Sequence, residues 1–460
     1  MIHGYQLNGY NIVLDIPSGS IHQVDPVAYD VIMKYQEQPE EDITIDILKE
    51  YEDDPSVNRE ELQELFQDIQ ELITHGKLFS PDEEWDGLSN HLWKQGDSSE
   101  VKALCLHVAH TCNMTCDYCF ASQGRCHGNR ALMTAEVGKK AMDFLIESSG
   151  ERRNLEVDFF GGEPLMNWGV VKEVVAYARG KEKEYNKHFR FTLTTNGLLI
   201  DDEIIDFANR EMDNVVLSLD GRKEVHDRLR RTTQGEGSYE KIVPLFQRFV
   251  LERGEKEYYI RGTFTRENID FTKDLYHMAD LGFDKLSIEP VVCSPEEPYA
   301  FKEEDLPLLM EQYEELALEM VRRGKEGRGF TFYHYMMELT GGPCIYKRLT
   351  GCGSGREYLA VTPWGDLYPC HQFVGEERFR MGDLWNGITA TEVASQFEGT
   401  SLISQEECRS CWARLYCSGG CAANSYHATG DIHGVYEYGC KLFKKRLECA
   451  IMIKVAQDEV

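Results

Sequence analysis

The sequence predicts an α/β protein built on a partial barrel of six strand–helix units, (β/α)6, with a small unit before it and a cysteine-rich domain after it. Three observations carry this prediction. Strand-like runs alternate with helical periodicity between residues 100 and 325, short amphipathic segments with turn signals fill residues 1–80, and nine of the fifteen cysteines lie beyond residue 340. We therefore expect domains at 1–80, 100–325 and 326–460, with a polar linker at 81–99.

The chain is long and strongly acidic. Its 460 residues suit about three domains, and 49 Lys and Arg against 79 Asp and Glu give a net charge of −30. This charge disfavours nucleic acid or an anionic membrane as a partner and suits a neutral or basic peptide, although a solvated acidic surface explains it equally well.

The chain begins without the basic and apolar regions of a signal peptide, and no apolar run approaches the ~18 residues of a membrane span. We therefore predict a cytoplasmic protein with no membrane partner. Because disulfides are rare in that reducing compartment, the fifteen cysteines indicate metal binding.

Residues 1–80 predict a winged-helix-like unit of strands and short helices. Alternating apolar residues at 10–16 and a second run at 21–24 predict strands, and an N-cap with an N1 proline predicts a helix at 26–35. An amphipathic helix follows at 59–75. A DNA-binding module is excluded by charge, because this unit carries 4 Lys or Arg against 17 Asp or Glu, a net −13.

The barrel is predicted from six apolar runs that alternate with helices, which implies a curved parallel sheet, short of the eight units of a closed TIM barrel. The predicted strands are 102–109, 155–160, 191–195, 214–219, 258–265 and 285–290, and the helices between them include 134–147, 168–179, 239–251 and 270–281. In TIM-like folds the active site lies at the carboxyl ends of the strands, so we expect the chemistry there.

Three cysteines follow the first predicted strand at the spacing C-x3-C-x2-C, namely Cys112, Cys116 and Cys119. Three thiolates on one loop can hold three corners of a cubane iron–sulfur cluster and leave the fourth iron open for a substrate. A zinc site is the alternative, with Cys126 or His127 as a nearby fourth donor.

This loop, with Tyr118 just before its last cysteine, resembles the signature of the radical S-adenosylmethionine (radical SAM) superfamily. The resemblance implies a [4Fe-4S] cluster on Cys112, Cys116 and Cys119, whose open iron chelates the amino and carboxylate groups of SAM. It also implies that an electron from the cluster cleaves SAM to a 5′-deoxyadenosyl radical, so that the cofactor supplies the difficult chemistry.

The same resemblance assigns contacts to SAM at the strand ends. The run Gly161-Gly162-Glu163-Pro164 matches the superfamily's G-G-E-P motif, which implies that Gly162 and Glu163 bind the SAM amino group. After the next two predicted strands, Asn196 and Ser218 are the expected ribose and methionyl contacts. Asp220 is a candidate to position a peptide or to handle a proton. Each of these could instead be an ordinary turn residue.

Two further contacts follow from later motifs. The stretch from His226 to Ser238 resembles the family's H-D-x-x-R…G-x-G-S block and implies that Arg230 clamps the SAM carboxylate, because a guanidinium binds a carboxylate through two hydrogen bonds. Arg228 and Arg231 are its rivals. At the end of the sixth strand, Ile288 is the implied apolar contact to adenine, assisted by the backbone of Tyr118.

The cysteines beyond residue 340 form a second field with ligand-like spacing. Cys352 precedes a G-x4-C element that ends at Cys370, and Cys408-x2-Cys411-x5-Cys417-x3-Cys421 is followed by Cys440. Metal binding explains so many cysteines at such spacing and core packing does not. Two zinc ribbons are the alternative to iron–sulfur clusters.

The spacing of the second field resembles the SPASM extension of peptide-modifying radical SAM enzymes. That resemblance implies one auxiliary [4Fe-4S] cluster on Cys352, Cys370 and Cys421, a second on Cys408, Cys411, Cys417 and Cys440, and therefore three clusters in the chain. Cys344 is near enough to Cys352 to be a further ligand of the first auxiliary cluster. If it is not a ligand, one iron of that cluster stays available to a cysteine of the substrate.

Residues 1–80 resemble the PqqD-type element, which recognises the leader of a ribosomally made peptide by adding a strand to a sheet edge. Together the three parts look most like a sactipeptide-type maturase (sactisynthase), and within that group like the maturases of six-cysteine (SCIFF) peptides. The resemblance implies a thioether between a cysteine sulfur and the α-carbon of a residue such as threonine.

The partners implied by this resemblance are a cysteine-rich precursor peptide with a leader and a low-potential electron donor of the flavodoxin or ferredoxin type. A sulfatase-type maturase that oxidises cysteine or serine is an alternative within the superfamily, as is a carbon–carbon cross-linking peptide synthase. An alternative of another class is a zinc-bound adaptor that only holds peptides.

Overall fold

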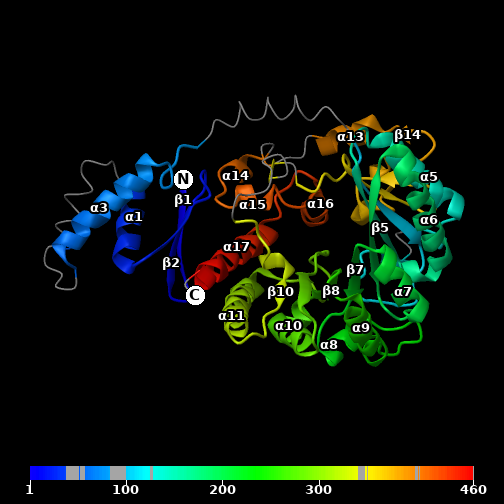
Figure 1. Cartoon of the computed structure of the whole chain (residues 1–460), viewed down its shortest axis with the longest axis horizontal. Helices are drawn as coiled ribbons and strands as arrows, with labels where there is room; N and C mark the ends of the chain where they lie inside the picture. The colour runs from blue at the N-terminus through cyan, green and yellow to red at the C-terminus, as the bar shows by residue number, and fades with distance from the viewer. Residues whose placement is uncertain are drawn as a thin grey trace.

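The computed structural model describes residues 1–37, 51, 57–82, 100–124, 128–339, 348–349, 351–398, 402 and 405–458. Most of the predicted linker at 81–99, and the candidate ligands Cys126, His127 and Cys344, lie outside this described part of the chain. The described strands form two sheets, a small one at the N-terminus and a large one that contains the predicted barrel (Figure 1).

The N-terminal sheet is antiparallel, in the order β1 (Ile2–Leu7), β2 (Tyr10–Asp15) and β3 (Ile21–Val24), and is followed by α1 (Pro26–Glu37) and α3 (Arg59–Thr74). All but β1 coincide with predicted segments. The missed strand nevertheless has a sequence signal, because Asn-Gly favours a two-residue hairpin turn. Asn8 and Gly9 have φ angles of 53° and 88° and bring Leu7 opposite Tyr10.

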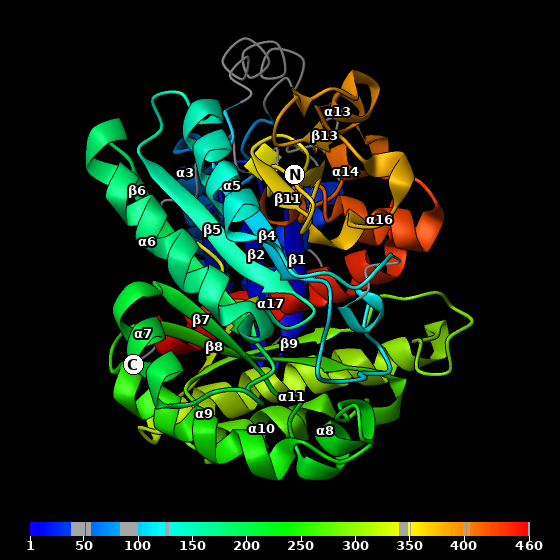
Figure 2. The same ribbon diagram turned by 90° about the vertical axis from the view of Figure 1, so that its right-hand side faces the viewer.

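The N-terminal sheet is covered on both faces. On one face, Val13 packs with residues of α1 and α3 in a small core that is separate from the main core. The other face carries Ile12 and Leu14, which are fully buried in the main core with residues of the last helix, α17 (Glu437–Asp458). The predicted N-terminal domain therefore shares a core with the rest of the protein, and α17 lies between the two sheets (Figures 1 and 2).

The large sheet contains the six predicted parallel strands in chain order and continues beyond them at both edges. The six are β4 (Ala103–Ala109), β5 (Asn154–Gly161), β6 (His188–Thr195), β7 (Asn214–Ser218), β8 (Glu257–Phe264) and β9 (Lys285–Pro290). At one edge β10 (Thr331–Phe332) pairs in parallel with β9, and at the other β11 (Tyr358–Val361) pairs in parallel with β4. The antiparallel strands β12 (Asp366–Tyr368), β13 (Gly382–Asp383) and β14 (Gly387–Ile388) follow β11. Among the described strands the sheet stays open, as a partial barrel does, and the expected C-terminal domain extends it.

Helices connect the parallel strands and cover the outer face of the sheet (Figure 2). They are α5 (Ala135–Ser148), α6 (Trp168–Tyr185), α7 (Asp202–Glu211), α8 (Lys223–Leu229), α9 (Tyr239–Arg253), α10 (Phe271–Asp280) and α11 (Leu306–Lys325). Short helices follow in the C-terminal part, namely α13 (Thr391–Glu398), α14 (Glu406–Arg409), α15 (Arg414–Cys417) and α16 (Ala422–Thr429). No helix in the described ranges is both long and apolar enough to cross a bilayer.

Successive side chains along each strand point to opposite faces of the sheet, one face toward the main core and the other toward a cavity on the inner side. In β5, Leu155, Val157 and Phe159 are fully buried in the main core under the helices, whereas Phe160 lines the cavity on the inner side. The inner face and the carboxyl edge of the sheet therefore carry the side chains available for chemistry.

Arg253, at the end of α9, joins the loops that enter β7 and β8. Its guanidinium donates to the carbonyls of Ala208, Met212, Asp213 and Glu257 at 3.3, 3.0, 3.0 and 2.7 Å, and the residue is 4% exposed. Arg253→Ala leaves buried carbonyls without donors and should lower the free energy of unfolding by about 3 kcal/mol.

Chemical denaturation measures this loss. Arg210→Ala is the matched control, because the side chain of Arg210 on α7 is 63% exposed. Equal losses in the two variants would contradict the structural role of Arg253.

Candidate active site

The first cysteine loop starts where β4 ends, at the carboxyl edge of the sheet. Cys112, Cys116 and Cys119 are all half-buried there. The loop is fastened to the segment after α8, because the N–H of Thr115 donates to the carbonyl of Arg231 at 2.8 Å. The position of the three sulfurs is therefore set by two strand-end segments that are far apart in the sequence.

The end of β5 fastens the other side of this loop. The N–H of Gly162 donates to the carbonyl of Ala109 at 2.7 Å, and that of Glu163 to the carbonyl of Thr111 at 2.9 Å. A Cβ on Gly162 would lie 2.1 Å from the Thr111 carbonyl oxygen, so only glycine fits. Gly162 was expected to let the backbone approach SAM, and the structure shows that it lets the end of β5 approach the cysteine loop.

Glu163, an expected SAM contact, is 1% exposed and lines the cavity. Its carboxylate accepts hydrogen bonds from Leu165 N–H at 3.0 Å, Thr195 Oγ1 at 2.8 Å and Asn196 N–H at 2.8 Å. Burial nevertheless raises the pKa of Glu163 to about 7. A ligand ammonium beside this carboxylate would be favourable, because a cation stabilises its ionised form.

Asn196 and Ser218 both lie at the cavity, at the ends of β6 and β7. The side-chain amide of Asn196 donates to Asn113 Oδ1 at 2.8 Å and lies 3.7 Å from the sulfur of Cys112. Asn196 thus connects the cysteine loop to β6.

The side chain of Ile288, the implied apolar contact to adenine, does not line the cavity. It is fully buried in the main core, as alternation along β9 requires when Glu289 faces the inner side. The apolar side chains that do line the cavity at this strand end are Pro290, Val291 and Val292.

Arg230 lies at the cavity in a cluster with Tyr118 and Asp220. Arg230 Nη1 donates to the Tyr118 hydroxyl at 2.9 Å, and that hydroxyl donates to Asp220 Oδ2 at 2.6 Å. Within the described chain, Arg230 Nε is buried without a hydrogen-bond partner. A ligand carboxylate would satisfy it, so the expected clamp fits this site. Asp220 is fully buried behind Tyr118, which removes it as a group that meets a peptide.

The two rival arginines lie elsewhere. Arg228 pairs with Glu267 at 3.1 Å on the surface, and Arg231 is exposed with its Nε donating to the Arg228 carbonyl at 3.1 Å. Arg230 is therefore the arginine that a carboxylate in the cavity would meet.

A cavity of about 680 Å³ connects the two cysteine fields. Cys112, Cys116 and Cys119 line one part, and Cys408, Cys411, Cys417, Cys421 and Cys440 line another. Sequence reasoning anticipated each field. It did not anticipate that they share one cavity, because that depends on how the C-terminal segment folds back over the strand ends.

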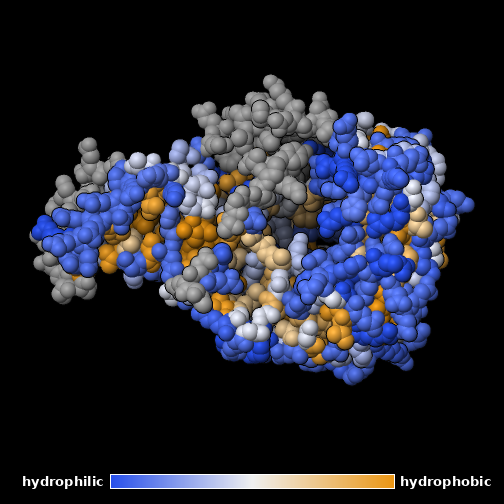
Figure 3. Space-filling view, viewed as in Figure 1, coloured by the Kyte–Doolittle hydropathy of each residue, from blue (hydrophilic) through white to orange (hydrophobic). Residues whose placement is uncertain are grey.

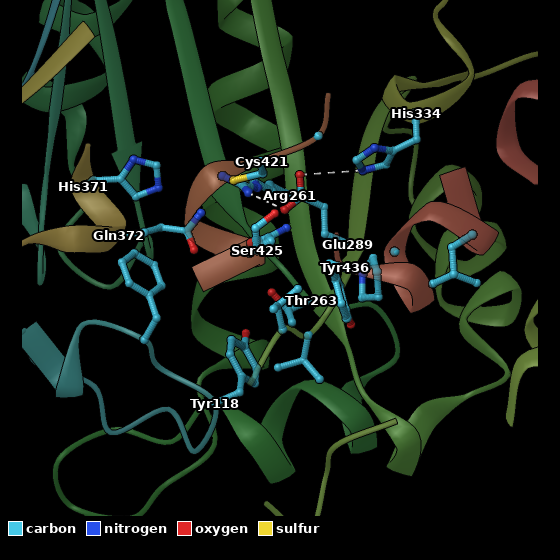
Figure 4. Close-up of a pocket in the computed structure, with 18 of the residues that line it drawn as sticks. Tyr118, Arg261, Thr263, Glu289, His334, His371, Gln372, Cys421, Ser425 and Tyr436 are labelled. Atoms are coloured by element: carbon cyan, nitrogen blue, oxygen red, sulfur yellow. Dashed lines mark hydrogen bonds and ion pairs between the residues drawn. The ribbon is translucent and has the colours of Figure 1, made fainter. Parts of the chain in front are cut away.

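The wall of this cavity also carries charged side chains that the sequence motifs do not include. Arg261 Nη2 donates to Glu289 Oε2 at 2.6 Å, and His334 Nε2 lies 3.8 Å from Glu289 Oε1. Figure 4 shows Glu289 between Arg261 and His334, with Cys421 nearby. Burial disfavours the ionised carboxyl, but Arg261, His334 and Arg446 together more than offset it, so the pKa of Glu289 lies below its usual value. Alternation along β8 is the sequence signal that could have identified Arg261, because it places this side chain on the inner face of the sheet.

The described C-terminal cysteines of the expected ligand sets have other thiols as neighbours, and their assignment to two clusters stays a prediction. Burial raises the pKa of Cys370 to about 12, with contributions from the neighbouring thiols of Cys421 and Cys352. Burial also raises the pKa of Cys417 to about 12, with contributions from three other neighbouring thiols, those of Cys440, Cys408 and Cys411. Each cysteine therefore has the members of its expected ligand set as neighbours.

The donor chemistry of all three groups fits iron–sulfur clusters. Thiolates are soft ligands, and a cubane cluster needs one thiolate on each of several irons. Among the residues that the structure describes, no three His, Cys, Asp or Glu side chains converge on a point that would hold a single metal ion.

Comparison with known proteins identifies the central part of the chain. The family described as the Radical SAM superfamily matches residues 106–253, from β4 to the end of α9. Residues 106–253 are therefore similar to a radical SAM domain. It is 22% identical over 366 residues to the radical SAM cyclopropyl synthase TigE of Paramaledivibacter caminithermalis, which covers 75% of this chain and 73% of TigE. It is 26% identical over 335 residues to the mycofactocin maturase MftC of Mycolicibacterium smegmatis, covering 70% of this chain and 79% of MftC.

Two solved structures share the fold. Native anSMEcpe with bound AdoMet and Kp18Cys peptide has a TM-score of 0.62 at 20% identity, over 78% of this chain and 99% of that chain. Streptococcus suis SuiB bound to precursor peptide SuiA has a TM-score of 0.53 at 16% identity, over 94% of this chain and 97% of that chain. The likeness to SuiB therefore extends over nearly the whole chain.

Gly162→Ala should displace the first cysteine loop, because its Cβ has no room beside Thr111. If that loop holds one of three equal clusters, iron bound after anaerobic reconstitution should fall by about a third. Colorimetric iron analysis measures this.

Gly169→Ala is the control, since nothing lies within 4 Å of a Cβ at that position. It should bind as much iron as the unaltered protein. Equal iron contents in the two variants would show that the backbone contact does not set the cysteine loop.

Proposed function

We propose that the protein is a radical SAM maturase that modifies a cysteine-rich, ribosomally made peptide by linking a cysteine sulfur to the α-carbon of an acceptor residue such as threonine. One observation carries the proposal. A single cavity of about 680 Å³ is lined both by the cysteine loop of the radical SAM domain and by cysteines of the C-terminal groups. A peptide residue in this cavity can face both at once.

The cofactor would be held by side chains whose chemistry matches it. Cys112, Cys116 and Cys119 supply three thiolates, the Glu163 carboxylate suits an ammonium, and the unsatisfied Arg230 Nε suits a carboxylate. A cluster and SAM bound there would supply a 5′-deoxyadenosyl radical able to take a hydrogen atom from a peptide α-carbon. Bonding of the peptide thiolate to that carbon leaves one electron, which a cluster at the C-terminal cysteines would accept. The protein's own task is to hold the peptide at that place and keep water out.

Glu289 is the residue we assign to accept the proton of the peptide thiol. It lines the cavity, its side chain is 39% exposed there, and Arg261 at 2.6 Å keeps it ionised. Asp220, the proton-handling candidate from the sequence, is fully buried and hydrogen-bonded by Tyr118. Geometry thus favours Glu289, since a general base must reach its proton.

The N-terminal unit suits recognition of a peptide leader. In the described sheet β3 pairs with β2 alone, so a further strand can add at its outer edge. Apolar side chains of β3 and α3, among them Val24, Leu65, Phe66 and Ile73, are partly exposed beside it. Figure 3 shows such apolar atoms on the surface of this unit. The net −13 of residues 1–80 favours a leader with basic residues.

The comparisons support a peptide substrate. They do not distinguish which reaction the protein carries out on that peptide. SuiB and anSMEcpe were each solved with a bound peptide, whereas TigE is named as a cyclopropyl synthase. A sulfatase-type maturase, a carbon–carbon cross-linking synthase and a zinc-bound adaptor are the rival functions. An electron donor of the flavodoxin or ferredoxin type would be needed for every radical SAM reaction among them.

Mass spectrometry of a treated peptide separates these functions. The substrate to use is the cysteine-rich peptide encoded nearest to this gene, with SAM and dithionite under anaerobic conditions. Thioether formation removes a pair of hydrogen atoms and blocks one thiol from alkylation by iodoacetamide. A carbon–carbon link or a cyclopropane leaves every thiol open to alkylation, and an adaptor leaves the peptide unchanged, so either result would contradict thioether formation.

Cys112→Ala, Cys116→Ala and Cys119→Ala should each abolish reductive cleavage of SAM, because the cluster needs all three thiolates. Chromatography of 5′-deoxyadenosine after reduction with dithionite is the measurement. Cys105→Ala, at a buried cysteine of β4, is the control and should still cleave SAM. Accumulation of 5′-deoxyadenosine in any of the three variants would show that the cluster assignment is wrong.

Glu289→Gln keeps the shape of the side chain and removes its charge. Cross-linking of the peptide should slow by about 100-fold, a typical general-base contribution, while SAM cleavage in the absence of peptide continues. Glu257→Gln, at the exposed start of β8, serves as the control and should leave cross-linking unchanged. A parallel fall of cross-linking and SAM cleavage in Glu289→Gln would refute a role restricted to the peptide.

A further inference from the structure

His3, on the first strand of the N-terminal sheet, is inserted between two elements of the C-terminal part. Its ring stacks on Trp412 with centroids 3.6 Å apart and planes 6° from parallel. On its other side, His3 Nε2 forms a hydrogen bond with Glu448 Oε1 at 3.0 Å. The side chains of His3 and Glu448 are only 19% and 15% exposed, so the contact is largely shielded from solvent.

Both partners of His3 belong to elements that carry cysteines of one group. Trp412 directly follows Cys411 in the loop between α14 and α15. Glu448 lies on α17, the helix whose first turn carries Cys440. His3 therefore spans the gap between two separate elements that must supply ligands to the same metal group.

Other contacts hold the N-terminal unit in this position. The Tyr5 hydroxyl donates to the Glu448 carbonyl at 2.9 Å. Arg414, whose side chain is 0% exposed, pairs with Asp82 at 2.5 Å and has its Nη1 3.6 Å from the sulfur of Met1. Met1 at the start of the N-terminal unit and Asp82 just after it thus both contact the first residue of α15, the helix that carries Cys417.

The loop needs such support because it has little regular structure of its own. The helices α14 and α15 that carry Cys408 and Cys417 are four residues long. Helices of that length are not stable without tertiary contacts. A partner that fixes the loop against α17 would therefore set the separation of the four sulfurs.

We propose that His3 is a positioning residue for the metal group of Cys408, Cys411, Cys417 and Cys440, supplied by the N-terminal unit. Stacking on Trp412 and bonding to Glu448 hold the loop and α17 at the separation that the ligands require. The inference rests on the proposed cluster at this group. Because coupling is reciprocal, metal in the group also favours docking of the N-terminal sheet against α17.

The test is iron retention by the anaerobically reconstituted full chain. His3→Ala and Trp412→Ala should release the iron of this group, about a third of the total, to a ferrous chelator about 5-fold faster than the unaltered protein. The remaining iron should leave at the unaltered rate. Gln6→Ala is the matched control, because Gln6 lies exposed on the same strand and its side chain bonds Asn11 at 2.8 Å within the sheet.

A spectroscopic measurement separates positioning from a general loss of stability. In the dithionite-reduced protein, electron paramagnetic resonance of His3→Ala should show a change in one cluster component alone, and SAM cleavage should persist. His3→Phe, which keeps a ring to stack on Trp412, should restore part of the slow release. General destabilisation would instead alter all components together and would overturn the proposal.

Two results would contradict the inference in distinguishable ways. If the unaltered protein binds about eight irons per chain rather than about twelve, and Cys417→Ala binds no fewer, this group holds no cluster, and the inference fails with that part of the proposed function. If about twelve irons bind and His3→Ala releases them at the rate of Gln6→Ala, the proposed function stands and the positioning role is wrong.

Discussion

The close backbone contact between Thr111 and Gly162 is the constraint on which the arrangement of the site depends. It holds the loop after β4 against the end of β5, and the Cβ of any other residue at position 162 would lie 2.1 Å from the Thr111 carbonyl. The three sulfurs, Glu163 and Asn196 then meet at one edge of the sheet. Gly162 therefore acts by letting the loop after β4 contact the end of β5. That contact brings the candidate ligand-binding side chains together.

Burial governs the chemistry of the thiols in the same way at both ends of the cavity. It raises the pKa of Cys112, Cys370 and Cys417 each to about 12, so these thiols stay protonated near neutral pH. Only a nearby cation reverses this, since metal binding displaces the proton of a ligating thiol. The protein thus provides dry sites where cysteine is inert without metal, joined by a cavity whose charged wall is formed by Arg261 and Glu289.

Much of this site could be predicted from the sequence, because strand periodicity and motif spacing are local signals. The six parallel strands lie where alternation placed them, and Glu163, Asn196 and Arg230 line the cavity as expected. A motif match does not show which way a side chain points, and alternation along β9 turns that of Ile288 into the core. The shared cavity and the insertion of His3 beside Trp412 depend on contacts between residues hundreds of positions apart, for which a single sequence carries no signal.

The proposed function requires metal clusters at the cysteine loop and at both C-terminal cysteine groups around one peptide-sized cavity. Anomalous diffraction from anaerobically grown crystals, measured on both sides of the iron absorption edge, tests it most directly. Three iron peaks are expected, one beside the loop of Cys112 and one beside each of the two C-terminal cysteine groups. A zinc-edge signal at any of these places, or iron beside the first loop alone, would contradict it.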